Sequence, residues 1–282
     1  MKDFDPVCVR KGNRDGVRLR LVLFLILAAL LLTAAVFAEY LYPYAPDAQL
    51  FASLEPPGPE HIAGTDRLGR DLFSRILAGL RTSVLSTLVL VAAMTAAGTA
   101  AGVVCGYFGG AADGILMRIS DICLAFPGLA AALGIAALLN GGLWSAAAAL
   151  FAVSWPKYAR LVRSRTLELK EADFVAAARV IGDSAPQIIL RHILPNVAGE
   201  VLVTAVLDMG AMMMELAGLS FLGLGAKPPA AELGSMMSEG RSLLQTCPWV
   251  VLGPGAAMFA AVSVFNLLGD AVRDWLDPRG SR

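Results

Sequence analysis

Two carboxylates and a methionine lie together in a strongly apolar stretch, residues 197–221. Asp208 and Glu215 are seven residues apart, about two turns of an α-helix, so they share one helix face with Met212 between them. Ionisable side chains inside such a stretch are costly and are by default candidates for function. Two carboxylates along a pathway favour the passage of a cation, and the thioether sulfur adds a soft ligand suited to a transition metal.

A structural role is the alternative for the same residues. Asp208 would then pair with a polar group on a neighbouring subunit, and the methionine would fill a gap in the packing. No histidine accompanies the carboxylates, because the two in the chain, His61 and His192, lie elsewhere. The sequence therefore assigns no metal site.

The elements that must hold these residues are membrane-spanning helices. Of the 282 residues, 57% are hydrophobic and 16% charged, and the mean hydropathy is +0.66, whereas an average soluble domain carries about 25% charged residues. This composition excludes an ordinary soluble enzyme and a disordered chain. The net charge of zero gives no reason to expect a nucleic acid as a partner. We predict an all-α integral membrane protein surrounded by lipid.

Six apolar stretches are long enough to cross a hydrocarbon core of about 30 Å, which takes about 20 residues. The long stretch from Ile122 to Pro156 is divided at Asn140-Gly141-Gly142, a turn-forming sequence. The predicted spans are residues 21–38, 82–112, 122–139, 143–156, 197–221 and 248–268. They form one membrane domain over residues 21–270, with tails at 1–20 and 271–282. The alternative for the first stretch, a cleaved signal peptide, is disfavoured because its apolar core is longer than the usual range of about 7–15 residues.

The distribution of Lys and Arg predicts the orientation. Basic residues gather in the first 20 residues and between 157 and 191, two regions that the predicted spans place on one side. Because basic residues accumulate in cytoplasmic loops, both termini are expected in the cytoplasm of a cell whose inner membrane holds the chain. The proline-rich segment 43–66 then lies outside, as an extended, irregular connection.

The segment 165–196 is the longest of the predicted cytoplasmic loops. An amphipathic, alanine-rich helix is predicted from Asp173 to Ile181, ending at Gly182, and a second helical piece from Ala185 ends at Pro195. Such a short surface helix either acts as a lever against another protein or only anchors two spans. The chain contains no GxxxxGK[ST] phosphate loop and no hydrolytic triad, so it is not expected to be an enzyme or to bind a cofactor.

This segment resembles the EAA loop of ABC importer permeases. Ala176-Ala177-Ala178 occupy the EAA positions, with alanine where the family has glutamate, Gly182 matches its glycine, and Ile193-Leu194-Pro195 match its close. In that family the helix docks on the ATP-binding subunit and transmits its closure to the spans. The resemblance implies that the ATPase-coupling loop of this chain contains Asp173, Ala176, Ala177, Ala178, Gly182, Ile193, Leu194 and Pro195.

Three further stretches resemble the C-type permeases of dipeptide, oligopeptide and nickel importers. Residues 64–75 are similar to GTDxxGRDxxSR, residues 220–225 to SFLGLG, and residues 266–278 to NLxGDxxRDxLDP. The resemblance implies the type I ABC importer permease fold with six spanning helices. It also implies a second, related permease, two ATP-binding subunits that hold ATP and Mg, and an external substrate-binding protein.

The first of these stretches crowds alternating charges into one predicted outer patch beside the second span. Asp66, Arg67, Arg70 and Asp71 either pair among themselves or dock the binding protein.

The substrate is predicted from the fifth span. Residues 207–210 and 217–221 look more like nickel permeases than like dipeptide permeases, so nickel, free or chelated, is the expected substrate, with peptides as the alternative. A different class, an ion-coupled secondary transporter, would show inverted repeats and would not need the 165–196 segment.

Overall fold

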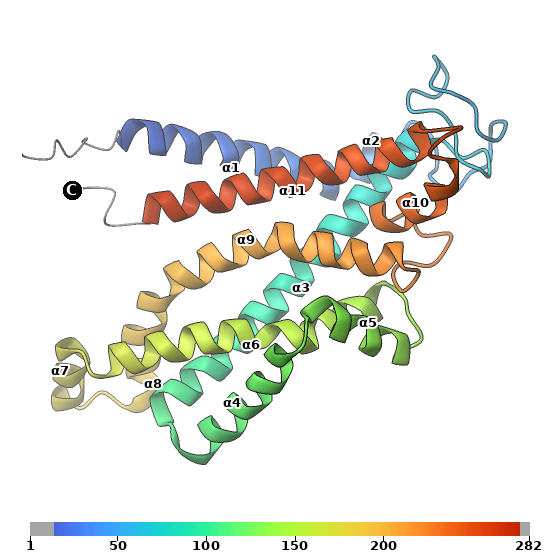
Figure 1. The fold of residues 1–282 in the computed structure, drawn as a ribbon. Coiled ribbons are helices and arrows are strands. Elements are labelled where there is room, and N and C mark those ends of the chain that lie inside the picture. Colours follow the sequence, from blue (N-terminus) through green and yellow to red (C-terminus); the bar gives the residue numbers. More distant parts are fainter. Residues whose placement is uncertain (1–13, 277–282) are drawn as a thin grey trace, which may run out of the picture.

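The computed structural model describes residues 14–276, and within them the fold is helical (Figure 1). The long elements are α1 (Arg14–Val36), α3 (Leu72–Phe108), α4 (Gly110–Ala125), α5 (Gly128–Leu138), α6 (Leu143–Lys170), α9 (Leu194–Phe221) and α11 (Trp249–Leu276). The short elements are α2 (Ala38–Leu41), α7 (Asp173–Ile181), α8 (Ala185–Ile188), a π-helical turn (Ile189–Ile193), α10 (Leu233–Gly240) and a 3-10 turn (Arg241–Leu243). The predicted tails lie partly outside the described residues, at 1–13 and 277–282.

The number of spans differs from the prediction. Four helical runs in the described part of the chain are long and apolar enough to cross a membrane, or five when the bent pair α4–α5 is taken as one span. The predicted span that is missing from this set is the fourth, 143–156, which corresponds to α6, whose 28 residues reach about 42 Å. Several Lys and Arg residues lower its apolar character. The all-α membrane fold is therefore confirmed, but the count of six spans is not.

The second span begins and ends earlier than predicted. α3 starts at Leu72 instead of residue 82, because both arginines that suggested a loop have carboxylate partners: Arg75 pairs with Asp66, and Arg81 with Glu39. It ends at Phe108 because the next residue, Gly109, has a φ of 64°, a value that favours glycine and interrupts the helix.

The third predicted span is two helices. α4 begins at Gly110 and meets α5 at a bend of 97°, where Pro127 cannot donate the hydrogen bond that would continue the helix. The predicted turn at residues 140–142 is confirmed, since all three residues have positive φ. The outer segment 43–66 is irregular, as predicted, but closely bonded: the N–H of Leu54 donates to the carbonyl of Asp66 at 3.1 Å.

α3 and α6 cross through a row of glycines. A Cβ at Gly98, Gly102 or Gly106 would collide with backbone or Cβ atoms of α6 between Trp155 and Thr166. Small residues spaced four apart let two membrane helices approach closely. This spacing was readable in the sequence and marks the contact that fixes α6 in place.

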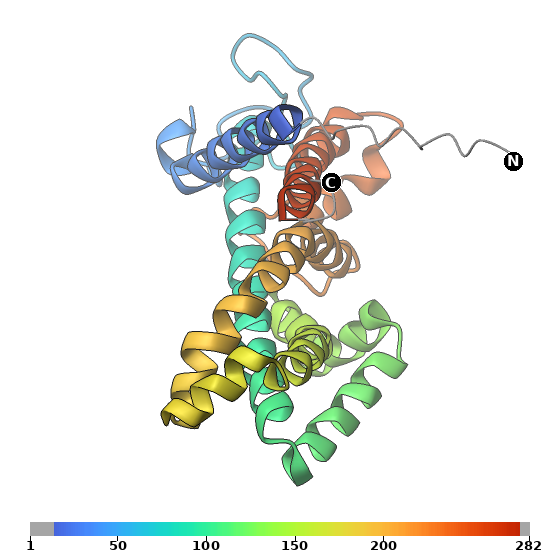
Figure 2. The same cartoon turned by 90° about the vertical axis from the view of Figure 1, so that its left-hand side faces the viewer.

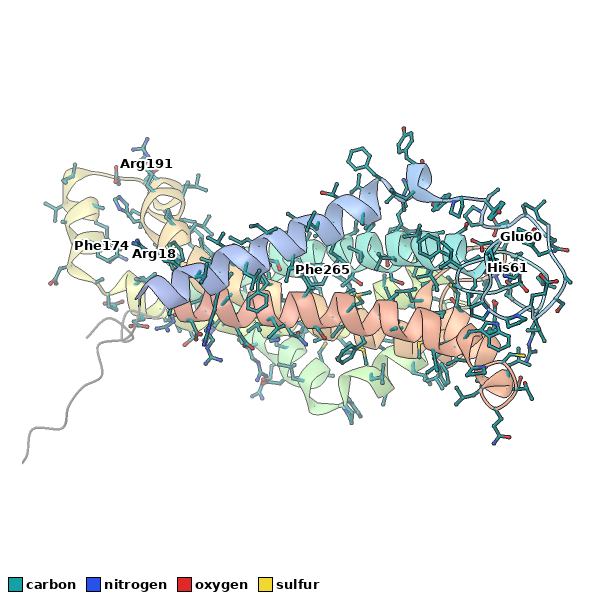
Figure 3. All side chains as sticks on the ribbon, turned by 90° about the horizontal axis from the view of Figure 1, so that it is seen from above. Arg18, Glu60, His61, Phe174, Arg191 and Phe265 are labelled. Atoms are coloured by element: carbon teal, nitrogen blue, oxygen red, sulfur yellow. The ribbon has the colours of Figure 1, made fainter. Side chains whose placement is uncertain are left out.

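The two ends of the helical bundle carry different segments. Figure 3 shows Arg18, Phe174 and Arg191 at one end and Glu60 and His61 at the other. The start of α1 and the segment 165–196 therefore share a side, as the predicted topology requires. α1 packs along α11, and the α4–α5 pair lies away from them against α6 (Figures 1 and 2).

Candidate functional site

Asp208, in the middle of α9, forms an ion pair with Lys157 of α6. The Lys157 Nζ lies 2.6 Å from Asp208 Oδ1. The Asp208 side chain is 6% exposed, whereas the Lys157 side chain is 55% exposed. Asp208 therefore has a charged partner within its own chain, which the sequence analysis did not predict.

The ion pair lies deep in the bundle. The outer ends of α6 and α9 are joined by a hydrogen bond from the N–H of Gly142 to the carbonyl of Leu224, at 3.0 Å. Lys157 is 14 residues from the first residue of α6, and Asp208 is 13 residues from the last residue of α9, which corresponds to about 20 Å along either helix. The pair therefore lies far from this end of both helices.

Met212 and Glu215 complete a group that we call the pathway cluster: Lys157, Asp208, Met212 and Glu215. Met212 is buried and Glu215 is half-buried. Among the described residues, Glu215 has no hydrogen-bond or ion-pair partner, and no group of three or more His, Cys, Asp and Glu side chains is placed to hold a metal ion. The cluster thus contains the buried, paired carboxylate of Asp208 and, two turns along α9, the carboxylate of Glu215, which has no partner among the described residues.

Lys157 was missed by the sequence analysis, which assigned it to a cytoplasmic loop. In the structure α6 runs on to Lys170, because its cations have carboxylate partners on the two neighbouring helices. Lys157 pairs with Asp208 and Arg165 with Glu200, both on α9. The remaining pairs, with α4, are Arg160 with Asp121 and Arg163 with Asp113, the latter through two hydrogen bonds at 2.5 and 2.7 Å. α6 is therefore linked by charge to both α4 and α9.

A second group of charges lies at the other end of the bundle from α7. We call Asp66, Arg70, Asp71 and Arg75 the outer cluster; all four are buried. Asp66 Oδ1 accepts hydrogen bonds from the N–H groups of Leu68 and Arg70, and its Oδ2 lies 2.6 Å from Arg70 Nε and 3.4 Å from Arg75 Nε. The carboxylate is thus satisfied within the chain.

The other two residues of the predicted outer patch have different roles: Asp71 caps a helix, and Arg67 is exposed. Asp71 caps α3, since its Oδ2 accepts hydrogen bonds from the N–H and hydroxyl of Ser74 at 2.7 and 2.6 Å. Arg67 is exposed and donates to the Ser242 hydroxyl. Of the four residues predicted to dock a binding protein, three are buried, and Arg67 is exposed.

The predicted coupling helix is present with its predicted ends. α7 spans Asp173–Ile181, and Gly182 follows with a φ of 99°, in the left-handed conformation that ends helices. Its inner face is fixed by the buried side chains of Val175 and Ala178. Ala176 and Ala177 are exposed. The large apolar side chains that α7 exposes are Phe174, Val180 and Ile181.

The second helical piece of this segment does not end at Pro195, contrary to the prediction. Ile193 is the last residue of the π-helical turn, and Leu194 and Pro195 form the first turn of α9. Proline is tolerated in a first turn, and the wider π turn before it relieves the clash that its ring causes in a regular helix. The segment therefore continues without a break into the helix that carries Asp208.

These features together define a multi-pass membrane permease, and comparison with known proteins identifies its family. Residues 98–282 match the family described as "Binding-protein-dependent transport system inner membrane component", and the chain belongs to it. It is 40% identical over 274 residues to the glutathione transport system permease protein GsiD of Pectobacterium atrosepticum. The matched region covers 96% of this chain and 89% of the relative. Proteins of the same name from Shigella boydii and Shigella sonnei match to the same extent.

Family membership confirms several expectations. The chain is a permease subunit of an ABC importer of the dipeptide and nickel type, located in the inner membrane as a multi-pass protein. It is not an enzyme, because ATP hydrolysis in such importers belongs to separate subunits. The ion-coupled secondary transporter is thereby set aside. The comparisons give no support to nickel as the substrate and agree better with the peptide alternative.

Proposed function

We propose that this chain forms one half of the translocation pathway of an importer for short peptides. The observation that carries the proposal is its similarity, along nearly the whole chain, to permeases named for glutathione transport. Glutathione is itself a short peptide, so the proposal names the class of substrate to which it belongs.

The pathway cluster supports an organic substrate over a metal ion. The charge of Asp208 is already balanced by the Lys157 ammonium at 2.6 Å. A metal ion at Asp208 would have to compete with that ammonium for the carboxylate. Glu215 alone offers too few ligands for a transition metal.

The remaining subunits follow from the importer class. We propose a second, related permease, two ATP-binding subunits that hold ATP and Mg, and an external binding protein. The ATP-binding subunit would receive α7 through Phe174, Val180 and Ile181, which form an exposed apolar surface of the kind that docks on a partner. Because Ala176 occupies the position of the EAA glutamate, this contact would rely on the burial of apolar side chains and not on a charge.

The orientation is part of the same proposal. With α7 on the ATP-binding side, both chain termini lie in the cytoplasm and the outer cluster faces the binding protein. Arg67 would contact this protein, because it is exposed whereas Asp66, Arg70 and Asp71 are buried.

The test is uptake by cells with and without this chain. Cells that lack the chain and cells in which it has been restored are given radiolabelled glutathione, labelled trialanine or ⁶³Ni²⁺ in separate assays. We expect peptide uptake to be lost and restored with the chain while nickel uptake stays constant. Loss of nickel uptake with unchanged uptake of both peptides would contradict the proposal.

A further inference from the structure

We infer that Lys157 and Glu215 form the two ends of a binding site for a zwitterionic peptide of two or three residues. This inference rests on the proposed function and specifies which part of the peptide each charge recognises. The peptide carboxylate lies on Lys157 and the peptide ammonium on Glu215, with Met212 between them.

The accessibility of the two end groups supports this assignment. Lys157 keeps 55% of its side chain exposed although it pairs with Asp208, so its ammonium has donors free for a second carboxylate. An ammonium exposed to lipid is costly, so the open side of Lys157 must face water or protein. Glu215 is half-buried and has no partner among the described residues, which leaves its carboxylate available to an ammonium.

The spacing of the end groups sets the length of the ligand. Lys157 lies at the level of Asp208, and Glu215 is seven residues further along α9, which corresponds to about 10 Å. Each charged end of the peptide is separated from its partner by a hydrogen bond of about 2.8 Å. An extended chain adds at most about 3.3–3.6 Å per residue, so a peptide of two or three residues reaches both charges.

The charge balance explains why a zwitterion is preferred. Lys157, Asp208 and Glu215 together carry a net negative charge, and Glu215 has no counter-ion from the described residues. A peptide with both ends free adds one positive and one negative charge, so each end group gains a partner and no new unpaired charge enters the membrane. Capping either end removes one of the two partners.

Met212 lies between the two charges along α9, but its side chain is buried in the hydrophobic core. It lies one turn from both carboxylates on the same face of α9. Its flexible side chain fills space in that core. The proposed site therefore recognises the two charged ends of the peptide, and no contact with the peptide side chains is assigned.

The test uses the complete purified transporter in proteoliposomes with its binding protein. Initial uptake rates are measured for labelled trialanine, N-acetyl-trialanine and trialanine amide, in the wild type and in the variants Lys157→Gln and Glu215→Gln. Glu200→Gln removes a carboxylate from the same helix outside the pathway cluster and is the matched control. Because the binding protein is the same in every assay, a change in the ratio of rates between probes reports on the permease.

Each variant should raise the relative uptake rate of a different capped probe. Glu215→Gln should raise the rate of the N-acetyl probe relative to trialanine by about tenfold, and Lys157→Gln should do the same for the amide, since each variant removes the charged partner that distinguishes a free peptide end from a capped one; tenfold corresponds to about 1.4 kcal/mol. Glu200→Gln should leave both ratios unchanged. Equal loss of all three probes in both variants would overturn the inference while leaving the peptide importer in place. If no peptide is taken up by the wild type, the proposed function itself fails.

Discussion

The outer cluster and the pathway cluster both contain acidic and basic side chains, but they differ in how many of these side chains have partners within the chain. In the outer cluster both oxygens of Asp66 are bonded to the backbone and to two arginines, and every member is buried. In the pathway cluster Lys157 has one partner and an open side, and Glu215 has none among the described residues. We conclude that the outer cluster holds the fold together, whereas the pathway cluster has capacity left for a ligand.

The largest effect is expected from Arg75→Met in the outer cluster. The Arg75 side chain is 2% exposed, and its removal leaves Asp66 with one cation fewer in a buried network. Breaking a buried ion pair costs about 3–5 kcal/mol. We expect little folded permease in the membrane, measured by the amount of detergent-stable transporter and its thermal unfolding. Wild-type stability of Arg75→Met would show that the outer cluster is not structural.

Asp208→Asn in the pathway cluster should have a smaller effect on stability. The change leaves Lys157 without its carboxylate, but the exposed ammonium still reaches water or protein, so the loss is expected near the 1.5–3 kcal/mol of one charged hydrogen bond. Peptide uptake should fall much further than the amount of folded protein, because Lys157 is no longer held in position. Quantitative blotting measures the amount of permease, and an uptake assay in the same cells measures peptide transport. A parallel fall in both would assign Asp208 a purely structural role.

The smallest effect on folding is expected from Arg67→Ala. Arg67 is exposed and belongs to the outer segment without belonging to the buried network. Exposed polar contacts of this kind contribute about 0–1 kcal/mol, so stability should not change measurably. Affinity of the transporter for its binding protein should fall, and binding kinetics on immobilised transporter would measure it. Unchanged affinity would exclude Arg67 from the docking surface.

The sequence predicts features that depend on local signals. Gly182 ends α7 as expected, because a helix end of this kind needs little more than a residue that adopts positive φ. The turn at residues 140–142 follows for the same reason. The pairing of Asp66 with Arg70 was one of two alternatives that the alternating charges left open, and the structure contains that pair.

Features that depend on distant partners were not predictable in the same way. Lys157 looked like the first residue of a loop because its partner Asp208 is 51 positions away in the sequence. The start of α3 was misplaced since the carboxylates that pair with Arg75 and Arg81 lie in other segments. Pro195 was taken as a helix end because nothing in the sequence marks the π-helical turn that precedes it.

The most direct test of the difference between the two clusters is photocrosslinking of a transported peptide. A labelled tripeptide with a photoreactive central residue is given to the assembled transporter, trapped by an ATP-binding subunit that cannot hydrolyse ATP, and the crosslinked residues are mapped by mass spectrometry. We predict crosslinks on α6 and α9 near Lys157 and Met212. Crosslinks confined to the outer segment 43–71, with none on α6 or α9, would contradict the account.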